Sequence, residues 1–353
     1  AICTLHYLSP DFSHSQMSDV LRLGVIGAGA VLQVAHLPVL KKLRTVEVAA
    51  LCDTDVPKAR ALASRYGVAS VYDDIQDLLS HEQLDALLIC TPNHLHEPHV
   101  LAGLSAGVHI LVEKPVALSS QSVQRIKRAA DRAERVVMVG MNHRYRPDTQ
   151  AIRSFVQGGE LGELDSIRAG WHVARPTRAP MGWRQRRDES GGGAMLDLGL
   201  TMIDLCFWMA GNPVPLRVSA SLSYAGRGDR AVEQSGSALV HCEGGLAMFI
   251  DVTWRYIGEG EYFGAGVRGT RGSANLNPLR VWKEMHGTVH DVSPSGSGAR
   301  ENLFIAAFRA QWAHFLAAVR GEAPPPPLEE QVIVQRVIEA IYRSAADGRD
   351  VTL

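Results

Sequence analysis

The chain has 353 residues, the length of about two domains, and 46% of them are hydrophobic, so two packed cores are expected. Its 36 Lys and Arg residues balance 37 Asp and Glu residues, and the formal charge of −1 argues against a nucleic-acid partner. The five cysteines are scattered and form no CxxC pair, which argues against a secreted disulfide framework and a cysteine zinc site. We therefore expect a soluble protein of the reducing cytoplasm.

No targeting or membrane segment is recognisable in the sequence. The longest apolar runs are far shorter than a membrane-spanning helix, and residues 1–15 lack the basic start and apolar stretch of a signal peptide. Met17 is followed by Ser-Asp and resembles a natural start. We expect residues 1–18 to be a tail outside the fold, and we expect no membrane partner.

Residues 19–141 alternate short apolar runs with helical patterns, which is typical of a parallel α/β sheet. The predicted strands are 21–26, 46–52, 70–72, 86–90, 109–112 and 136–139. The predicted helices are 31–43, 56–66, 75–79, 98–106 and 119–134. Six strands joined by crossover helices predict a doubly wound dinucleotide-binding domain.

Residues 142–353 change character and predict a second, α+β domain. Predicted helices are 149–157, 194–209 and 329–344, the last one after the Pro324–Pro327 spacer. Predicted strands are 167–173, 217–224, 237–242, 246–254, 262–267 and 280–283. Consecutive strands with glycine turns predict a mostly antiparallel sheet that is open on one face. The spacing of Trp208, Trp254 and Trp312 is typical of core residues.

A glycine turn follows the first predicted strand and opens a helix. It comprises Gly27, Gly29, Ala30 and Val31, with Leu32 where a third glycine or alanine is usual. Such a turn brings the backbone close to a pyrophosphate at a helix N-terminus, although an ordinary strand–helix turn remains the alternative.

Asp53 ends the second predicted strand, 26 positions after Gly27. A carboxylate there binds the adenosine ribose and repels a 2′-phosphate, and no arginine follows it, so NAD is favoured over NADP. Capping the following helix is the alternative role for Asp53.

Two further loops fall at the carboxyl ends of predicted strands, where a doubly wound sheet binds its ligands. They are Thr91-Pro92-Asn93-His-Leu-His96 and Glu113-Lys114-Pro115. A lysine at this edge suits proton transfer to a bound substrate, whereas a lysine considered alone would be interpreted as a surface charge.

The chain from Leu21 onward resembles the glucose–fructose oxidoreductase / inositol dehydrogenase / rhizopine-catabolism (Gfo/Idh/MocA) family. Besides the turn and the two loops above, the shared motifs are Gly140-x-Asn142-x-Arg144-Tyr145, Trp183-Arg184, Gly191-Gly-Gly-Ala-x-Leu-Asp197-x-Gly199 and the ending Ser344-Ala-Ala-Asp-Gly-Arg-Asp-Val-Thr. The resemblance implies a Rossmann domain, an open-faced sheet domain that mediates oligomerisation, and a nicotinamide-dependent oxidoreductase acting on sugars or cyclitols.

The resemblance also implies residue roles. Lys114 matches the catalytic lysine, aimed by Glu113 and by Pro115, which is often cis in this family. Asn93 and His96 match positions beside the nicotinamide ribose. Asp197 matches the aspartate that holds the substrate hydroxyls. Further residues expected near cofactor or substrate are Thr91, Pro92, Arg144, His172, Trp183, Arg184 and Thr201.

Thr201 departs from the family pattern. It stands four residues after Asp197, where relatives usually have a catalytic histidine, and a hydroxyl cannot accept a proton near neutral pH. His172 and His143 are the candidates for a relocated histidine, with an ordinary structural role as the alternative. His94, His96 and His99 lie close together but lack a carboxylate or cysteine at ligand spacing, so no metal is expected.

We therefore expect an NAD-dependent dehydrogenase that oxidises a secondary hydroxyl of a sugar or cyclitol, or runs the reverse reduction, as a homodimer or homotetramer. Lys114 would act as the acid/base and Asp197 would orient the substrate. The alternative, suggested by Thr201, is a sensor of the same fold that binds NAD and a sugar without turnover.

Overall fold

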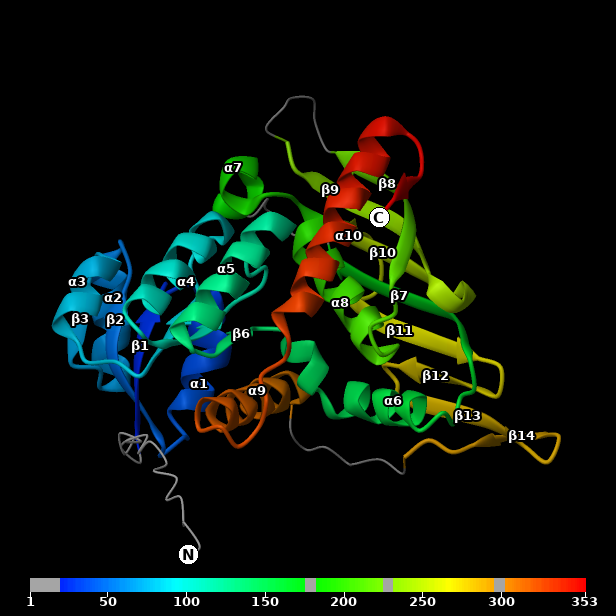
Figure 1. Ribbon diagram of the computed structural model, residues 1–353, viewed down its shortest axis with the longest axis horizontal. Coiled ribbons are helices and arrows are strands. Elements are labelled where there is room, and N and C mark those ends of the chain that lie inside the picture. The colour runs from blue at the N-terminus through cyan, green and yellow to red at the C-terminus, as the bar shows by residue number, and fades with distance from the viewer. Residues whose placement is uncertain (1–19, 175–181, 225–230, 295–301) are drawn as a thin grey trace, which may run out of the picture.

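The structure is a computed structural model that describes residues 20–174, 182–224, 231–294 and 302–353. The expected tail, residues 1–18, lies outside the described residues. Two sheets lie side by side, each with its own helices (Figure 1). The expected class, a doubly wound α/β unit followed by an α+β unit, is confirmed.

The first sheet has six parallel strands in the order β3-β2-β1-β4-β5-β6. They are β1 (Leu21–Ile26), β2 (Val46–Cys52), β3 (Ser70–Tyr72), β4 (Ala86–Ile89), β5 (His109–Val112) and β6 (Val137–Val139), each within one residue of its predicted bounds. Helices cover both faces, so a central strand such as β4 is buried at every position. The strand order reverses between β1 and β4, and doubly wound sheets bind ligands at that switch point.

Three helices of this half, α2, α3 and α5, begin at a residue whose side chain caps them. They are η1 (Leu32–His36), α1 (Leu37–Leu40), α2 (Val56–Tyr66), α3 (Ile75–His81), η2 (Asn93–Leu95), α4 (His96–Ser105) and α5 (Ser120–Ala133). The Asp55 side chain caps α2 by accepting from the Lys58 N–H, and Gly67 ends that helix at φ 74°. Where one helix over 31–43 was predicted, the first turns form the π-helix η1.

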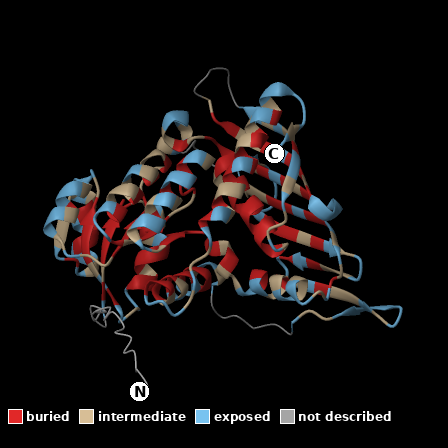
Figure 2. Cartoon of the chain, viewed as in Figure 1, coloured by how far each residue is buried: buried red, intermediate tan, exposed pale blue. Residues whose placement is uncertain are grey.

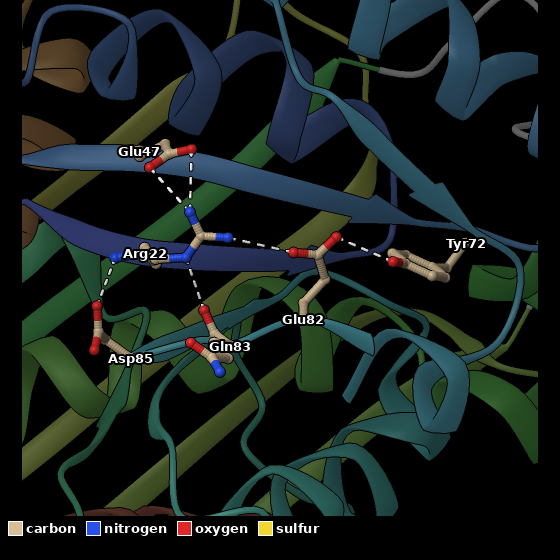
Figure 3. Close-up of polar contacts among 6 residues, drawn as sticks. All are labelled: Arg22, Glu47, Tyr72, Glu82, Gln83 and Asp85. Atoms are coloured by element: carbon tan, nitrogen blue, oxygen red, sulfur yellow. Dashed lines mark hydrogen bonds and ion pairs between the residues drawn. The ribbon is translucent and has the colours of Figure 1, made fainter. Parts of the chain in front are cut away.

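A polar cluster around Arg22 ties β1 to its neighbours (Figure 3). The guanidinium contacts Glu47 on β2 and Glu82 after α3, each at 3.3 Å, and donates to the Gln83 carbonyl at 2.8 Å. The Arg22 backbone N–H donates to Asp85 at 2.7 Å. Because half-exposed pairs of this kind each contribute little free energy, we assign the cluster to strand register rather than to stability.

The second sheet has nine strands in the order β14-β13-β12-β11-β7-β10-β9-β8-β15 and is antiparallel except for the parallel pair β7–β10. They are β7 (Leu164–Ala174), β8 (Pro215–Tyr224), β9 (Glu233–Cys242), β10 (Ala247–Tyr256), β11 (Tyr262–Gly269), β12 (Gly272–Leu276), β13 (Arg280–Met285), β14 (Thr288–Asp291) and β15 (Val351–Thr352). Three of these strands were not predicted. β12 begins at a glycine and alternates only over its last three residues, β14 is exposed throughout, and β15 has two residues, so each gives a weak strand pattern.

The helices and short helical turns of the second half are η3 (Asn142–Tyr145), α6 (Pro147–Gln157), η4 (Trp183–Gln185), α7 (Arg187–Ser190), η5 (Met195–Gly199), α8 (Leu200–Met209), η6 (Glu243–Gly245), α9 (Leu303–Val319) and α10 (Leu328–Asp347). Helices α6, α8 and α10 cover one face of the second sheet (Figure 1). The apolar stretch Arg187–Met209 is long enough to cross a membrane. However, 94% of its most apolar 18-residue segment is buried inside the protein, as expected of a central core helix (Figure 2).

Helix α9 was not predicted, and it does not pack on the sheet that precedes it. It falls within the range 142–353 expected to form the second domain, yet Phe308, Trp312 and Phe315 join the core beneath β1 and η1. The helix is apolar over most of its circumference, so it lacks the polar face that marks an amphipathic helix. The chain therefore returns to its first domain before ending on the second.

The other face of the second sheet is an open surface with an apolar centre. Leu239 on β9 faces Phe249 on β10, and the Arg168 guanidinium lies 4.6 Å from the Phe249 ring centre. These side chains line a hollow of about 830 Å³ together with His172, Tyr256 and Tyr262. Such a half-apolar sheet face is typical of an association surface.

We predict that this face joins copies of the chain. Light scattering at micromolar concentration should give the mass of a dimer or tetramer, and Leu239→Glu should lower that mass, because burying a carboxylate at the contact costs its desolvation free energy. Val34→Glu is the matched control at a 59% exposed position on η1, and it should leave the measured mass unchanged. A native chain that stays monomeric would contradict the prediction.

Candidate active site

The glycine turn lies between β1 and η1, facing the end of β4. At Gly27, φ is +93°, and a Cβ would lie 2.6 Å from the Cys90 backbone, so only glycine fits there. At Gly29 the nearest atom to a Cβ would be 4.0 Å away, which leaves room in front of the turn. Ala30 and Val31 start the helix, and N–H groups of a first helical turn have no acceptor within the helix. The turn therefore fits a pyrophosphate.

Asp53 supports this turn from the end of β2. One carboxylate oxygen accepts from the Ala28 N–H at 2.6 Å, and the other accepts from the Asp55 N–H at 2.8 Å. Lys58 was missed by the sequence analysis, and its ammonium lies 3.0 Å from that second oxygen. Asp53 thus lies beside the glycine turn at the end of β2, with a cation next to it, and its ribose contact stays a prediction.

The Thr91 and Glu113 loops follow β4 and β5 and lie against each other. His96 links them, because its Nδ1 is 2.6 Å from the Pro115 carbonyl and its Nε2 is 2.8 Å from the Thr91 carbonyl. His96 is 1% exposed, and burial lowers its pKa, so it supports the loops rather than facing a ligand. The cofactor contact expected for His96 stays a prediction.

Other residues of the first loop also have structural bonds. The Asn93 amide is buried and donates to the Ser190 carbonyl at 2.8 Å, which ties the loop to α7 in the second domain. Thr91 Oγ1 lies 3.1 Å from His99 Nδ1, and burial lowers the pKa of His99 to about 4. Pro92 precedes η2 as its N-cap. The loop therefore joins the two domains at the edge of the cofactor turn.

Lys114 and Asp197 meet across the two domains. Lys114 Nζ donates to Asp197 Oδ1 at 2.9 Å and to the Asp197 carbonyl at 2.7 Å. The Lys114–Pro115 peptide is cis, as the resemblance implies. Burial raises the pKa of Asp197, but Lys114 and Arg184 outweigh it and hold the pKa below its usual value. Both side chains keep partial exposure, 22% for Lys114 and 32% for Asp197, so a substrate can reach them.

Three glycines before Asp197 are required by what packs on them. A Cβ at Gly192 would lie 2.0 Å from the Tyr342 hydroxyl, and one at Gly193 would lie 2.0 Å from the Glu233 carbonyl. The buried Glu233 carboxylate accepts from the Gly193 and Met195 N–H groups at 2.8 and 2.9 Å, and from Tyr342 at 2.8 Å. Glu233, which the sequence analysis missed, therefore fixes the start of η5 and the place of Asp197.

Aromatic and cationic side chains border the same pair. Arg184 stacks on Trp183 with 4.5 Å to the ring centre, and it is exposed. Trp254 was predicted to be core, but it is half-buried and its hydrogen bond helps to lower the pKa of Asp197. Residues 175–181, which precede this segment in the chain, lie outside the described residues.

Two expected substrate contacts lie elsewhere. Arg144 is 4% exposed, and its guanidinium binds Asp204 at 2.5 and 2.8 Å and also pairs with Glu330, so it forms a buried structural network. His172 lies on the open face of the second sheet, 2.8 Å from Asp251. Neither residue is free to contact a substrate at Lys114.

His143 and Thr201 lie in the interior. His143 stacks on Phe263 at 4.7 Å, and burial, aided by Arg146 and Lys114, lowers its pKa to about 3. Thr201 is 4% exposed, and its Oγ1 has no hydrogen-bond partner among the described residues. No group of three or more His, Cys, Asp or Glu residues in the described ranges could hold a metal ion.

The unpaired hydroxyl of Thr201 predicts a stabilising substitution. Thr201→Val keeps the shape and removes a buried group without a partner, so the free energy of unfolding should rise by about 1 kcal/mol. Thr149→Val is the matched control, because buried Thr149 Oγ1 donates to the carbonyls of His143 and Arg146 at 2.7 and 2.8 Å. That control should lower stability by about 1–3 kcal/mol in denaturant titrations. Equal effects in both variants would contradict the assignment.

Comparisons with known proteins match both halves of the chain. Residues 21–141 match the oxidoreductase family with an NAD-binding Rossmann fold, and residues 149–275 match the GFO/IDH/MocA C-terminal domain. D-glucoside 3-dehydrogenase of Escherichia coli (strain K12) is 29% identical over 95% of this chain and 98% of its own length. 1,5-anhydro-D-fructose reductase of Ensifer adhaerens is 28% identical over 93% of this chain and 97% of its own. GenD2 from gentamicin A biosynthesis, solved in complex with NAD, is 27% identical and has a TM-score of 0.81 over 98% of this chain and 99% of its own. The chain therefore belongs to the GFO/IDH/MocA family of oxidoreductases with an NAD-binding Rossmann domain.

Proposed function

We propose that this protein is an NAD-dependent dehydrogenase that oxidises a secondary hydroxyl of a sugar or cyclitol, or carries out the reverse reduction. The observation that carries the proposal is the Lys114–Asp197 pair, with Nζ 2.9 Å from Oδ1, at the edge of the sheet where the glycine turn lies. A proton-transfer group and a hydroxyl-binding carboxylate are thus held together, half-exposed, beside a turn that fits a pyrophosphate.

The cofactor supplies a hydride acceptor when bound; the chain supplies binding, orientation and proton transfer. Lys114 has three donor positions and uses two of them on Asp197, so one remains for the substrate oxygen. During oxidation the neutral amine form of Lys114 takes the hydroxyl proton and becomes the ammonium, and during reduction the ammonium gives a proton to the carbonyl oxygen. The ionised Asp197 accepts from a neighbouring hydroxyl and so selects a polyhydroxylated substrate.

The relatives support this substrate class. The Escherichia coli relative is named for dehydrogenation of a D-glucoside at position 3, and the Ensifer adhaerens relative for reduction of 1,5-anhydro-D-fructose. The Trp183–Arg184 stack beside Asp197 adds an aromatic surface of the kind that packs on sugar rings, together with a cation.

We predict that Lys114→Met lowers kcat by about 10²–10⁴, the usual contribution of one proton-transfer group, while NAD affinity stays nearly unchanged. Lys114→Arg keeps the charge beside Asp197 but cannot give up its proton, so it should be similarly slow. Asp197→Asn should lower kcat by a smaller factor, because Asp197 orients the substrate and does not transfer the proton. The measurement is NADH absorbance in a screen of sugars and cyclitols.

Lys127→Met is the control, because Lys127 pairs with Asp131 and Glu329 away from this site, and its activity should match the native chain. The pH profile of kcat/KM should lack a histidine step near 6.5, since burial keeps His143 neutral above about pH 3. If NAD binds and no sugar is turned over, and Lys114→Met changes nothing, the protein is a sensor.

For the cofactor, we predict that NAD binds at least about tenfold more tightly than NADP, because the Asp53 carboxylate repels a 2′-phosphate. Asp53→Ala should narrow this difference mainly by improving NADP binding. The nearby Lys58 ammonium offsets part of the repulsion, so Lys58→Met should widen the difference. Calorimetry with both cofactors measures these changes, and equal affinities in the native chain would overturn the role of Asp53.

A further inference from the structure

A buried chain of hydrogen bonds runs from α9 to the lysine loop. The Trp312 indole N–H donates to His36 Nδ1 at 3.1 Å, and His36 Nε2 lies 2.9 Å from Glu113 Oε1. Trp312 and His36 are both 0% exposed. The three residues come from three separate elements: α9, the π-helix η1 after the glycine turn, and the end of β5.

The chemistry of the indole fixes the direction of this chain. Trp Nε1 can only donate, so His36 Nδ1 must be the acceptor and carries no proton. The single ring proton of a neutral His36 therefore sits on Nε2 and is donated to Glu113. A second ring proton on Nδ1 would face the indole N–H, and Phe308 packs edge-on against the same ring at 4.9 Å. Trp312 thus leaves Nε2 as the ring nitrogen that donates to Glu113.

Both oxygens of Glu113 lie within hydrogen-bond distance of a partner. Its other oxygen accepts from the Lys114 backbone N–H at 3.3 Å, and a Cβ at Gly140 would lie 2.9 Å from Oε1, so that glycine leaves room for the carboxylate. Cys90 and His96 also face it, and burial raises the pKa of the Cys90 thiol and lowers the pKa of His96, so both are neutral. No lysine or arginine of the described residues pairs with Glu113.

We infer that Trp312 and His36 are positioning residues that keep Glu113 an uncompensated carboxylate beside the nicotinamide site, where its charge favours oxidised over reduced cofactor. The inference rests on the proposed function, since it needs the nicotinamide near the Lys114 loop. The oxidised ring is a cation and the reduced ring is neutral, so a fixed negative charge discriminates between them. A residue far along the chain would thereby set the balance of the two cofactor forms.

The test compares dissociation constants of NAD⁺ and NADH for the full chain. Trp312→Phe keeps an aromatic ring and removes the indole N–H. His36 Nδ1 can then carry a second proton, and the positive charge of the ring offsets the negative charge of Glu113. The ratio of the NAD⁺ constant to the NADH constant should rise about fivefold, which corresponds to about 1 kcal/mol. Glu113→Gln removes the charge directly and should shift the ratio in the same direction.

Two further variants keep the inference falsifiable if Trp312→Phe folds poorly. His36→Gln offers both an acceptor for the indole and a neutral donor for Glu113, so its ratio should stay near the native value. His36→Leu removes the donor that stabilises the Glu113 carboxylate, so Glu113 should take up a proton more readily and the ratio should move toward that of Glu113→Gln. Trp208→Phe, at a buried tryptophan of α8 that packs against Arg153, controls for loss of a core indole and should leave the ratio unchanged.

The outcomes are distinguishable. If Trp312→Phe and His36→Leu weaken both cofactor forms equally, they act only through packing and the inference is overturned. An unchanged ratio in Glu113→Gln overturns it as well. If the native chain binds neither NAD⁺ nor NADH, the proposed function itself fails.

Discussion

The arrangement of the molecule depends on one contact between its halves, the pairing of Lys114 with Asp197. Lys114 stands at the end of a strand of the parallel sheet, and Asp197 stands in the π-helix η5 that begins the central helix of the second domain. Each residue by itself is a partly exposed charged side chain, which is common in proteins and indicates no site. With 2.9 Å between Nζ and Oδ1, the two domains share a single polar centre beside the glycine turn.

Lys114 and Asp197 are each held in place by residues that lie behind them. On the Asp197 side, the buried Glu233 and Tyr342 clamp a glycine turn that no larger residue could occupy. On the Lys114 side, His96 links the two strand-end loops. Unpaired buried polar groups are costly, so these fully bonded networks constrain the loops strongly. Thr201 is one of the few described residues with a buried polar atom that has no partner, and it stands where the family resemblance implies a histidine.

Long-range connections also make the two domains one unit. Helix α9 leaves the second half of the chain and packs beneath the first sheet, where Trp312 reaches His36. The Asn93 amide binds the Ser190 carbonyl, which ties a loop of the first domain to α7. The surroundings of Lys114 therefore include segments far apart in the sequence, and hydrogen bonds connect α9 to the lysine loop through His36.

The sequence by itself determined the parallel sheet and the ligand edge, because apolar runs separated by helical patterns and glycine turns are local signals. It also placed Gly27, Asp53, Lys114 and Asp197 in the correct elements. The unpredicted features depend on contacts between distant residues. Arg144 was predicted to contact substrate, but it forms ion pairs with Asp204 and Glu330 in the interior. His172 was predicted to do the same, but it lies on the open face of the second sheet. Strand alternation shows that neighbouring side chains point to opposite faces, but only tertiary packing decides which face meets the site.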